Sequence, residues 1–543
     1  MTTFERAASL RAMASSTFDV VVIGAGMTGA GVALDAASRG LRVALIDRGD
    51  IASGTSSKSS KMVHGGLRYL QQREFRLVYE NLRERQRLLR NAPYLVEPLP
   101  FLIPLFGSNG VASRALVRGY STALRIYDLS GGWRIGQRFR RVTADEALEH
   151  LPTLRTERLV AGFLYYDARG DDARVALVLA MTAALSYGAQ VATYASAFGV
   201  VRNDAGRVQA LRVRDELTGQ EFEISTLSVI NATGVWADDV FTMAEQRTSH
   251  RITPAKGVHL SVSASRLPAD VAAVFNVPHD RRSVFVVPFV DAPYTYVGTT
   301  DTAYDGALDE PLCTPEDVAY LLSAVNASTS SNLDVNDVTG VWAGLRPLLA
   351  PDAGRTLSER TADLSRRHQV SDSRDGIVHV TGGKWTTYRQ MAQDAVDALS
   401  AYVSPLARVR TKSLPLYGVG EWRPSNELET HLYRRFGEHA REVVKLIDDD
   451  SSLANAPLAH QPYLAAEFVY SARHEMVTSL IDLLTRRSRA HLQNARTTAQ
   501  GADGVARLVA PVLGWSEQDI DREVDAYLAL AKREFAAAGL QLR

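Results

Sequence analysis

Residues 18–47 read FDVVVIGAGMTGAGVALDAASRGLRVALID, and the architecture of the chain can be worked out from this stretch. Residues 20–23 and 43–46 are short apolar runs rich in β-branched side chains, which predicts two parallel strands buried on both faces. A glycine-rich turn and a helix lie between them. The order strand, helix, strand therefore predicts a parallel sheet covered by helices.

The turn carries the spacing GxGxxG at Gly24, Gly26 and Gly29, and the second strand runs into Asp47. The first glycine permits a tight turn, the second lets backbone N–H groups approach a pyrophosphate, and the third lets the helix pack closely on the strand. Asp47 is expected to accept hydrogen bonds from ribose hydroxyls. An ordinary glycine-rich turn is the alternative, and the spacing does not separate NAD from FAD. The candidate ligands here are Gly24, Ala25, Gly26, Met27, Thr28, Gly29, Asp47 and Arg48.

A small polar loop follows Asp47 and is crowded with hydroxyl side chains. Short hydroxyls and backbone amides there would wrap a diphosphate, and the two glycines that follow would leave room for a flat ring. A flexible linker is the alternative interpretation. The candidate cofactor residues are Ser53, Gly54, Thr55, Ser59, Ser60, His64, Gly65, Gly66 and Leu67.

Two later strand ends carry similar turns, each of which is common in proteins when taken alone. Residues 232–234 follow a buried strand, and Gly382 and Gly383 precede a helix expected to begin near Trp385. A helix N-terminus at this place would stabilise phosphate oxygens or the anionic edge of a flavin ring. The candidates are Ala232, Thr233, Gly234, Trp236, Gly382, Gly383, Lys384, Trp385 and Thr386.

The composition excludes several classes of protein. Lys plus Arg and Asp plus Glu both number 61 in 543 residues, so nucleic acid is not an expected partner. One cysteine, Cys313, and the lack of an apolar stretch of ~18 residues predict a cytoplasmic chain that does not span a membrane. Peripheral attachment stays open. No zinc or calcium ligand pattern occurs, so no metal site is predicted.

Several motifs together resemble the FAD-dependent, quinone-linked glycerol-3-phosphate dehydrogenases. They are GAGMTGAG, SSKSSKMVHGGLRYL, EFRLVYENLRERQRLLRNAPYL, NATGVWAD, KGVHL, GTTD, GLRPL and TGGKWTTYR. HGGLRYL and GGKWTTYR are far more specific than GxGxxG. The resemblance implies oxidation of sn-glycerol 3-phosphate to dihydroxyacetone phosphate, with hydride passing from C2 to FAD and electrons passing on to a membrane quinone. It also suggests a homodimer.

The implied fold is a glutathione-reductase-like, Rossmann-type α/β domain that binds FAD, interleaved with an antiparallel-sheet substrate domain and followed by helices. The FAD-dependent oxidoreductase region is expected at 18–404, with the FAD domain built from about 18–100, 150–250 and 340–404. Strand-rich sequence at 258–302 predicts the antiparallel sheet, and a long helix is expected from about 67 to 90. Helical spacing predicts a C-terminal helical domain at 405–543.

The resemblance also assigns roles at the substrate. A phosphate dianion calls for clustered cations, and Arg68, Arg346 and Lys384 are the implied substrate contacts, with Tyr69 beside them. His64, Arg346 and Lys384 are the candidate catalytic residues. His64 is either the base for the C2 hydroxyl or a group that positions the flavin ring. Surface ion pairs are the alternative for the cations, and Lys256 and residues 299–301 are either active-site positions or structural turns.

Residues 111–141 contain seven arginines and one acid, interleaved with Leu, Ile, Tyr, Trp and Phe. A basic amphipathic patch binds anionic headgroups, so this segment is the candidate for attachment to the inner face of the cell membrane. A solvated helical face is the alternative.

Three other functions stay open at this point. An oxidase of the same family would pass electrons to O₂, and an amine or amino-acid oxidase would share the architecture without needing three cations for a phosphate. A flavoprotein without catalytic activity would bind FAD only.

Overall fold

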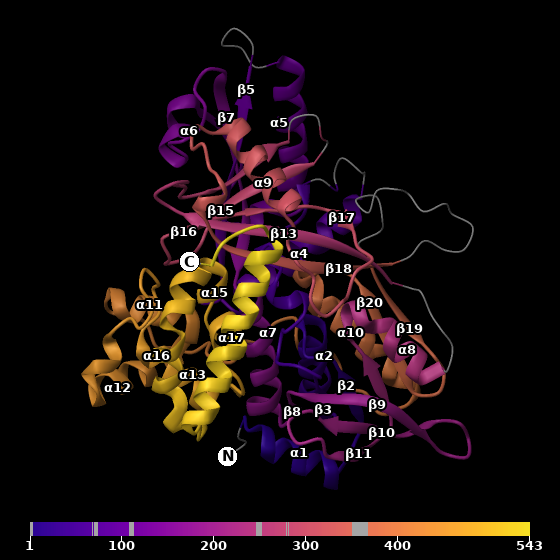
Figure 1. Cartoon of the computed structure of the whole chain (residues 1–543). Helices are drawn as coiled ribbons and strands as arrows, with labels where there is room; N and C mark the ends of the chain where they lie inside the picture. The colour runs from indigo at the N-terminus through magenta and orange to yellow at the C-terminus, as the bar shows by residue number, and fades with distance from the viewer. Residues whose placement is uncertain are drawn as a thin grey trace.

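Three β-sheets and a C-terminal group of helices make up the part of the chain that the structure describes (Figure 1). The structure is a computed structural model and describes residues 4–67, 69, 74–107, 113–245, 252–277, 280, 282–349 and 367–542. Arg68, one of the candidate substrate contacts, lies outside the described residues.

The first strands form a six-stranded sheet in the order β19-β20-β12-β2-β3-β8. All its neighbours are parallel except β19 and β20, so the predicted parallel sheet is confirmed. Its strands are β2 (Val20–Ile23), β3 (Val43–Ile46), β8 (Gln190–Ala192), β12 (Val229–Asn231), β19 (His368–Asp372) and β20 (Ile377–Gly382). They come from distant parts of the chain, as expected for an interleaved fold.

Apolar helices cover this sheet. They are α2 (Met27–Ser38), α7 (Asp172–Met181) and α10 (Tyr388–Ala398), and α2 packs between the other two. All residues of β2 and β3 are buried, as are all those of α7. The sequences of β2 and β3 are continuous apolar runs because neighbouring elements exclude water from both faces of the sheet.

A larger, mostly antiparallel sheet lies beside the first. Its central path is β17-β13-β16-β15-β14-β5-β7-β4, with β18 paired to β13 and β6 paired to β7. The strands are β4 (Met62–Val63), β5 (Val96–Phe106), β6 (Arg140–Thr143), β7 (Leu159–Gly170), β13 (Ile252–Ser263), β14 (Ala272–Asn276), β15 (Ser283–Pro288), β16 (Tyr294–Gly298), β17 (Thr302–Ala303) and β18 (Val338–Leu349). The antiparallel sheet expected at 258–302 is present, and β5 and β7 extend it from earlier in the chain.

A small third sheet has the order β1-β11-β10-β9. Its strands are β1 (Thr17–Phe18), β9 (Ala195–Arg202), β10 (Val208–Asp215) and β11 (Glu221–Thr226). The alternating pattern of residues 189–201 predicts one strand, and this prediction is wrong, because β8 and β9 belong to different sheets. Tyr194 separates them with a φ of 51°, a left-handed conformation that a continuous strand cannot contain.

Helices flank the larger sheet, some of them at one end of the molecule and one, α4 (Phe75–Asn91), near its middle (Figure 1). The helix expected from about 67 to 90 appears as α4, which begins at Phe75 and ends at Asn91. The others are α5 (Arg114–Leu129), α6 (Ala144–His150) and α9 (Pro315–Ser328). Near the other sheets lie α1 (Arg6–Ser15) and α8 (Ala237–Glu245).

The C-terminal part of the chain is helical. It comprises α11 (Glu427–Phe436), α12 (Ala440–Asp449), α13 (Ala465–His474), α14 (Leu480–Asp482), α15 (Ala490–Gln493), α16 (Ala495–Leu513) and α17 (Glu517–Ala537). We call residues 427–537 the helical region. It has its own apolar core, and α15, α16 and α17 also contact β18 of the larger sheet. None of the described helices is both long enough and apolar enough to cross a bilayer.

Candidate active site

A cavity of about 620 Å³ lies where the carboxyl ends of the parallel strands meet the larger sheet. Ligands of open α/β sheets bind at this edge. The candidate residues that line it are Gly24, Gly26, Met27, Thr28, Asp47, Arg48, Ser53, Gly54, Thr55, Ser59, Ser60, His64, Gly66, Leu67, Tyr69, Ala232, Thr233, Gly234, Trp236, Arg346, Gly382, Gly383, Lys384, Trp385 and Thr386. The structure thus brings together candidates from four distant stretches of sequence.

The glycine turn after β2 is packed too closely for side chains. A Cβ on Gly24 would lie 2.8 Å from the carbonyl oxygen of Ala232, and one on Gly29 would lie 1.7 Å from that of Gly24. Gly24 also has a φ of +102°. Gly29 does not line the cavity, so its role is to let α2 approach the turn. Gly26 is the N-cap of α2 and lines the cavity, which leaves the backbone of the turn open to a phosphate group.

Asp47 lines the cavity and also braces the turn. Its Oδ2 accepts from the backbone N–H of Ala25 at 2.7 Å, and its Oδ1 accepts from that of Gly49 at 2.9 Å. Burial raises the pKa of this carboxyl, although the two N–H groups oppose the shift. Ala25 therefore supports Asp47 and does not itself face the cavity. Each carboxylate oxygen has a second lone pair, so the expected contact with ribose remains compatible with these bonds.

The polar loop folds as a 3₁₀ turn, Thr55–Ser57, against the start of α2. The Oγ of Ser56 accepts from the backbone N–H of Met27 at 2.8 Å, so Ser56 lies at the helix N-terminus. Sequence reasoning missed Ser56, although it belongs to the same run of hydroxyls. Thr55 donates to the carbonyl of Leu345 at 2.5 Å, and this hydrogen bond ties the loop to β18.

The HGG turn at 64–66 rests on a buried polar cluster. The N–H of Gly65 donates to Asp167 Oδ1 at 3.2 Å, and Tyr127 and Arg85 donate to the same carboxylate. A Cβ on Gly65 would lie 2.5 Å from the Tyr127 hydroxyl. Gly65 therefore supports the turn without lining the cavity, whereas His64 and Gly66 line it.

Three of the candidate substrate contacts share the cavity. The Nζ of Lys384 lies 3.6 Å from the centroid of the Tyr69 ring, a cation–π contact. Arg346, on β18, donates to Thr299 Oγ1 at 3.2 Å and to the carbonyl of Thr300 at 3.1 Å. Its guanidinium also lies 3.4 Å from Asp301. Residues Thr299 and Asp301 of the GTTD motif therefore belong to the cavity.

Lys256 has a structural role. Its Nζ is 2.7 Å from Asp317 Oδ2 and 3.2 Å from the carbonyl of Leu312, away from the cavity lining. Asp317 lies in the first turn of α9, so this ion pair ties β13 to α9. The sequence left open whether Lys256 is an active-site residue or a structural one, and the structure favours the structural role.

His259 is a cavity residue that sequence reasoning did not select, although the KGVHL motif contains it. Its Nε2 is 2.8 Å from the Oγ of Ser60, and its ring stacks on Trp342 with centroids 4.9 Å apart. Burial, with Lys61 and Arg346 nearby, lowers the pKa of His259 well below its usual value. A neutral imidazole therefore holds Ser60 at the cavity wall.

Comparison with known proteins places this site in a family. The pattern of the FAD dependent oxidoreductase family matches residues 19–389. The pattern described as the C-terminal domain of alpha-glycerophosphate oxidase matches residues 378–520. The glycerol-3-phosphate dehydrogenase 2 of Mycobacterium tuberculosis is 40% identical over 98% of this chain and 91% of its own length. This chain belongs to the FAD-dependent glycerol-3-phosphate dehydrogenase family.

Two further relatives support the same assignment. The human mitochondrial glycerol-3-phosphate dehydrogenase is 34% identical over 93% of this chain and 71% of its own length. The solved structure of the glycerol-3-phosphate dehydrogenase from Bacillus halodurans, complexed with FAD, is 28% identical, covers 98% of both chains and has a TM-score of 0.77. Membership of the family therefore extends over the helical region as well as the sheets.

FAD is the cofactor of this family, and the cavity fits it. The glycines leave a cradle that Cβ atoms would fill, and the N-terminus of α2 faces it, as a pyrophosphate requires. The two glycines at 382–383 have φ values of +72° and +80°, which open the second turn before α10. Among the described residues, no group of His, Cys, Asp and Glu is arranged to hold a metal ion.

Proposed function

We propose that the protein oxidises sn-glycerol 3-phosphate to dihydroxyacetone phosphate and passes the electrons to a membrane quinone. One observation carries the proposal: Tyr69, Arg346 and Lys384 line the same cavity as the glycine turns that fit FAD. The relatives named glycerol-3-phosphate dehydrogenase support the choice of substrate. Bound FAD supplies a two-electron acceptor for hydride from C2 of the substrate.

The cations of the cavity account for recognition of the phosphate. Arg346 offers a planar fork that matches phosphate oxygens, and Lys384 offers a compact charge. Tyr69 lies against Lys384 and limits where its ammonium group can move. Glycerol, a neutral triol, lacks the charge that these groups would neutralise, so the site is expected to select the phosphorylated substrate over glycerol.

The proton of the C2 hydroxyl must leave as hydride departs. His64 is half-buried in the cavity wall and is the candidate base, since imidazole titrates near physiological pH. The alternative role of His64 is to position the flavin ring, and this role requires the same place in the cavity wall. The rate of flavin reduction separates the two roles.

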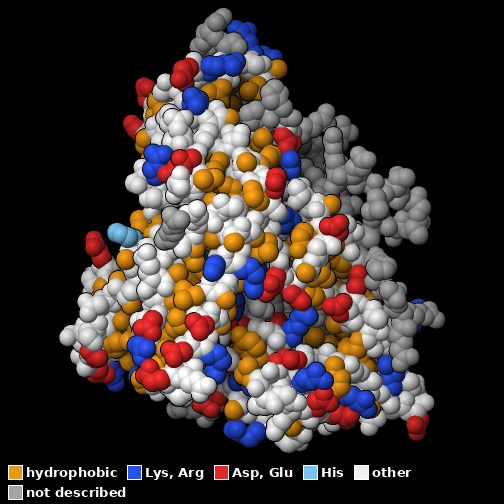
Figure 2. Space-filling model, in the orientation of Figure 1, with side chains coloured by type: hydrophobic (Ala, Val, Ile, Leu, Met, Phe, Trp, Pro, Cys, Tyr) orange, Lys and Arg blue, Asp and Glu red, His pale blue; other side chains and the backbone are white. Residues whose placement is uncertain are grey.

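The outer face of α5 is the proposed contact with the membrane. In this helix only Leu124 and Tyr127 are buried, whereas Leu129 is 83% exposed and Trp133, just beyond it, is 55% exposed. Figure 2 shows Lys and Arg side chains beside hydrophobic ones at the end of the molecule where Figure 1 places α5. Such a face binds anionic lipid and would bring the enzyme to its quinone at the inner face of the cell membrane. Residues 111 and 112 of this segment lie outside the described part.

The first experiment is an anaerobic titration of the purified protein with sn-glycerol 3-phosphate, followed by its visible spectrum. We expect the flavin band to bleach. A yellow protein that no glycerol 3-phosphate bleaches would overturn the substrate assignment and leave an amine oxidase or a flavoprotein without catalytic activity.

Transfer of the electrons to O₂ is the second candidate, and the match of residues 378–520 to the C-terminal domain of alpha-glycerophosphate oxidase favours it. The acceptor is tested by mixing the reduced protein with air and, separately, with a soluble quinone analogue. Rapid reoxidation by quinone and slow reoxidation by air support the dehydrogenase. The reverse order supports the oxidase.

A further inference from the structure

Three arginines within four residues of the helical region point at the loop that surrounds the cofactor cavity. Arg486 and Arg487 end a π-helical turn, Leu483–Arg487, and Arg489 follows as the N-cap of α15. None of them lines the cavity, yet all three contact the segment 50–61 or its support. The helical region therefore contacts the loop of the cofactor site through a short segment, 486–489, which we call the arginine segment.

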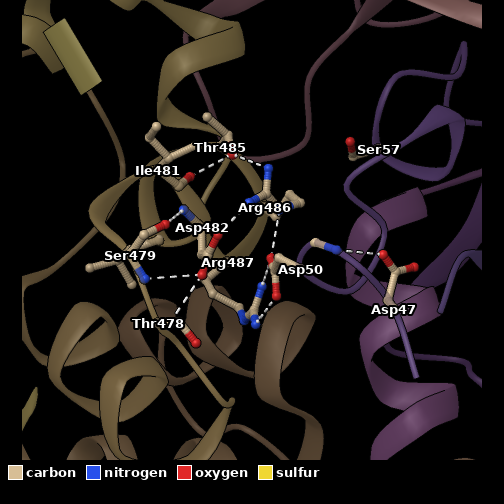
Figure 3. A network of polar contacts seen from close by, with 12 residues as sticks. Asp47, Asp50, Ser57, Thr478, Ser479, Ile481, Asp482, Thr485, Arg486 and Arg487 are labelled. Carbon is tan, nitrogen blue, oxygen red and sulfur yellow. Dashed lines mark hydrogen bonds and ion pairs between the residues drawn. The ribbon is translucent and has the colours of Figure 1, made fainter. Parts of the chain in front are cut away.

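The first anchor holds the start of the loop. Asp50 is 1% exposed and lies three residues after Asp47. Arg487 binds both of its carboxylate oxygens, at 2.6 and 2.8 Å, and Arg486 Nε donates to Oδ2 at 2.6 Å (Figure 3). Burial alone would raise the pKa of this carboxyl, but Arg487 and Arg486 outweigh burial and hold the pKa below its usual range. Asp50 is thus a charged, fully paired anchor.

The second anchor holds the end of the loop. Arg489 Nη2 donates to the carbonyl of Ser57 at 2.6 Å and to Asp172 Oδ1 at 2.7 Å. The other oxygen of Asp172 accepts from the N–H of Ser59 at 3.0 Å and from its hydroxyl at 2.6 Å. Lys61 is a second cation beside this carboxylate, 3.4 Å from Asp172. The loop is therefore bonded to Arg489 directly and through Asp172.

The arginine segment is itself held in place. Arg487 Nε donates to the carbonyl of Glu475 at 2.9 Å, and the Ser488 hydroxyl donates to the carbonyl of Leu483 at 2.9 Å. The N–H of Arg489 donates to the Tyr463 hydroxyl at 3.0 Å. The three guanidinium groups are thus presented by a backbone that the helical region has already ordered, so little freedom is lost when they bind the loop.

We propose that the arginine segment is a positioning element for FAD, which fastens both ends of the loop 50–61 so that its central residues face the cofactor. Ser53, Gly54, Thr55 and Ser56 lie between the two anchors and line the cavity. Ser56 meets the N-terminus of α2, where the pyrophosphate of FAD belongs. The proposal rests on the FAD site described above and adds that retention of FAD depends on side chains of the helical region that do not touch it.

The test compares two conservative changes in the arginine segment with one matched control. R487K and R489K keep the charge but lose the planar fork that binds two acceptors. R174K is the control, because Arg174 is 3% exposed and joins α7 to Glu475 of the helical region at 2.7 Å without contacting the loop. FAD release is measured by the fluorescence of free flavin on dilution and by reconstitution of the apoprotein.

We expect the dissociation constant of FAD to rise about tenfold or more in R487K and R489K, since each loses a charge-assisted hydrogen bond, and to stay within about twofold in R174K. Trypsin should also cleave the FAD-bound variants faster after Lys58 and Lys61, and only there. Equal effects in all three variants, or none in R487K and R489K, would overturn the proposal.

A milder variant covers the case in which the buried lysines prevent folding. Arg486 has a side chain that is 11% exposed and supports only the first anchor, so R486Q should fold and show a smaller rise of a few-fold in the same constant. An unchanged constant in R486Q would count against the first anchor. Failure of glycerol 3-phosphate to reduce tightly bound FAD would instead contradict the proposed substrate and leave this inference standing.

Discussion

Arg346 illustrates how one side chain on a strand serves both the fold and the proposed chemistry. β18 pairs with β13 so that Arg346 lies opposite Ala255, and the guanidinium then reaches Thr299, Thr300 and Asp301 at the cavity. These acceptors, together with the carbonyl of Lys256 at 3.4 Å, fix the orientation of the fork. A phosphate group can therefore bind a guanidinium whose orientation is already set.

Replacing Arg346 with Ala should raise the KM for sn-glycerol 3-phosphate by about ten- to a hundredfold, the loss expected for a charged contact of about 1.5–3 kcal/mol. The FAD content should not change, because the FAD turns lie on other strands. Steady-state kinetics and the ratio of flavin to protein provide the check. An unchanged KM would remove Arg346 from the substrate site.

Replacing His64 with Asn should slow reduction of the flavin by roughly a hundredfold or more, as for loss of a general base. Asn has a similar reach but does not accept a proton near pH 7. Stopped-flow mixing with glycerol 3-phosphate under anaerobic conditions measures the rate directly. A near-normal rate would leave His64 with the positioning role alone.

At the scale of elements, the start of α2 depends on contacts between backbones. The carbonyl of Gly24 occupies the place where a Cβ of residue 29 would lie, and no rotamer can relieve a contact with backbone. Local sequence therefore specifies this turn almost completely, since only glycine satisfies both the conformation and the distance.

Replacing Gly29 with Ala should destabilise the protein by about 1–3 kcal/mol through overpacking and should lower its FAD content. The matched control is Gly504→Ala in α16, where a Cβ meets nothing within 4 Å. That change should stabilise the protein by about 0.5–1 kcal/mol and leave FAD bound. Thermal unfolding and flavin content test both. Normal FAD content in the Gly29 variant would contradict the assigned role of the turn.

The pairing of strands in the larger sheet is a feature that local sequence patterns do not predict. β5 and β7 pair along Val96–Phe106 and Leu159–Gly170, and β14 then joins β5 in parallel. Alternation of apolar residues predicts that a strand forms, but not which distant strand it meets. The break at Tyr194 between β8 and β9 likewise depends on which sheet each half joins.

At the scale of the whole molecule, α5 and the helical region lie at different ends (Figure 1). The proposed membrane face is therefore separate from the arginine segment that supports the cofactor loop. Variants of the α5 face should therefore leave FAD retention unaffected, and variants of the arginine segment should leave lipid binding unaffected.

Changing Arg114, Arg118 and Arg125 together to Glu should weaken binding to anionic vesicles by about a hundredfold or more, at about 1 kcal/mol for each basic residue. Co-sedimentation with such vesicles at low salt measures it. In the control, three exposed basic residues of the helical region are changed to Glu instead: Arg441, Lys445 and Arg473. Undiminished binding of the α5 variant, or equal loss in the control, would contradict the proposed membrane face.

Some residues of the site could be predicted from local sequence motifs, whereas others are brought to the site only by the tertiary structure. The cofactor turns, Lys384 and Arg346 could be found from motifs because their chemistry needs glycine or a cation at a set place in the chain. Sequence motifs did not single out three other residues: Ser56, His259 and Asp172. Their roles come from partners that lie far away in sequence, such as His259 with Ser60 and Asp172 with Arg489.

The amino-acid sequence by itself determined the parallel strands, the glycine turns, the FAD-type family and most of the cavity wall, because burial and backbone geometry act over a few neighbouring residues. Only the tertiary structure decided that Lys256 pairs with Asp317 and that the arginine segment meets the loop more than 400 residues before it. Pairing of this kind depends on how separate elements pack, and a periodic pattern contains no information about its partner.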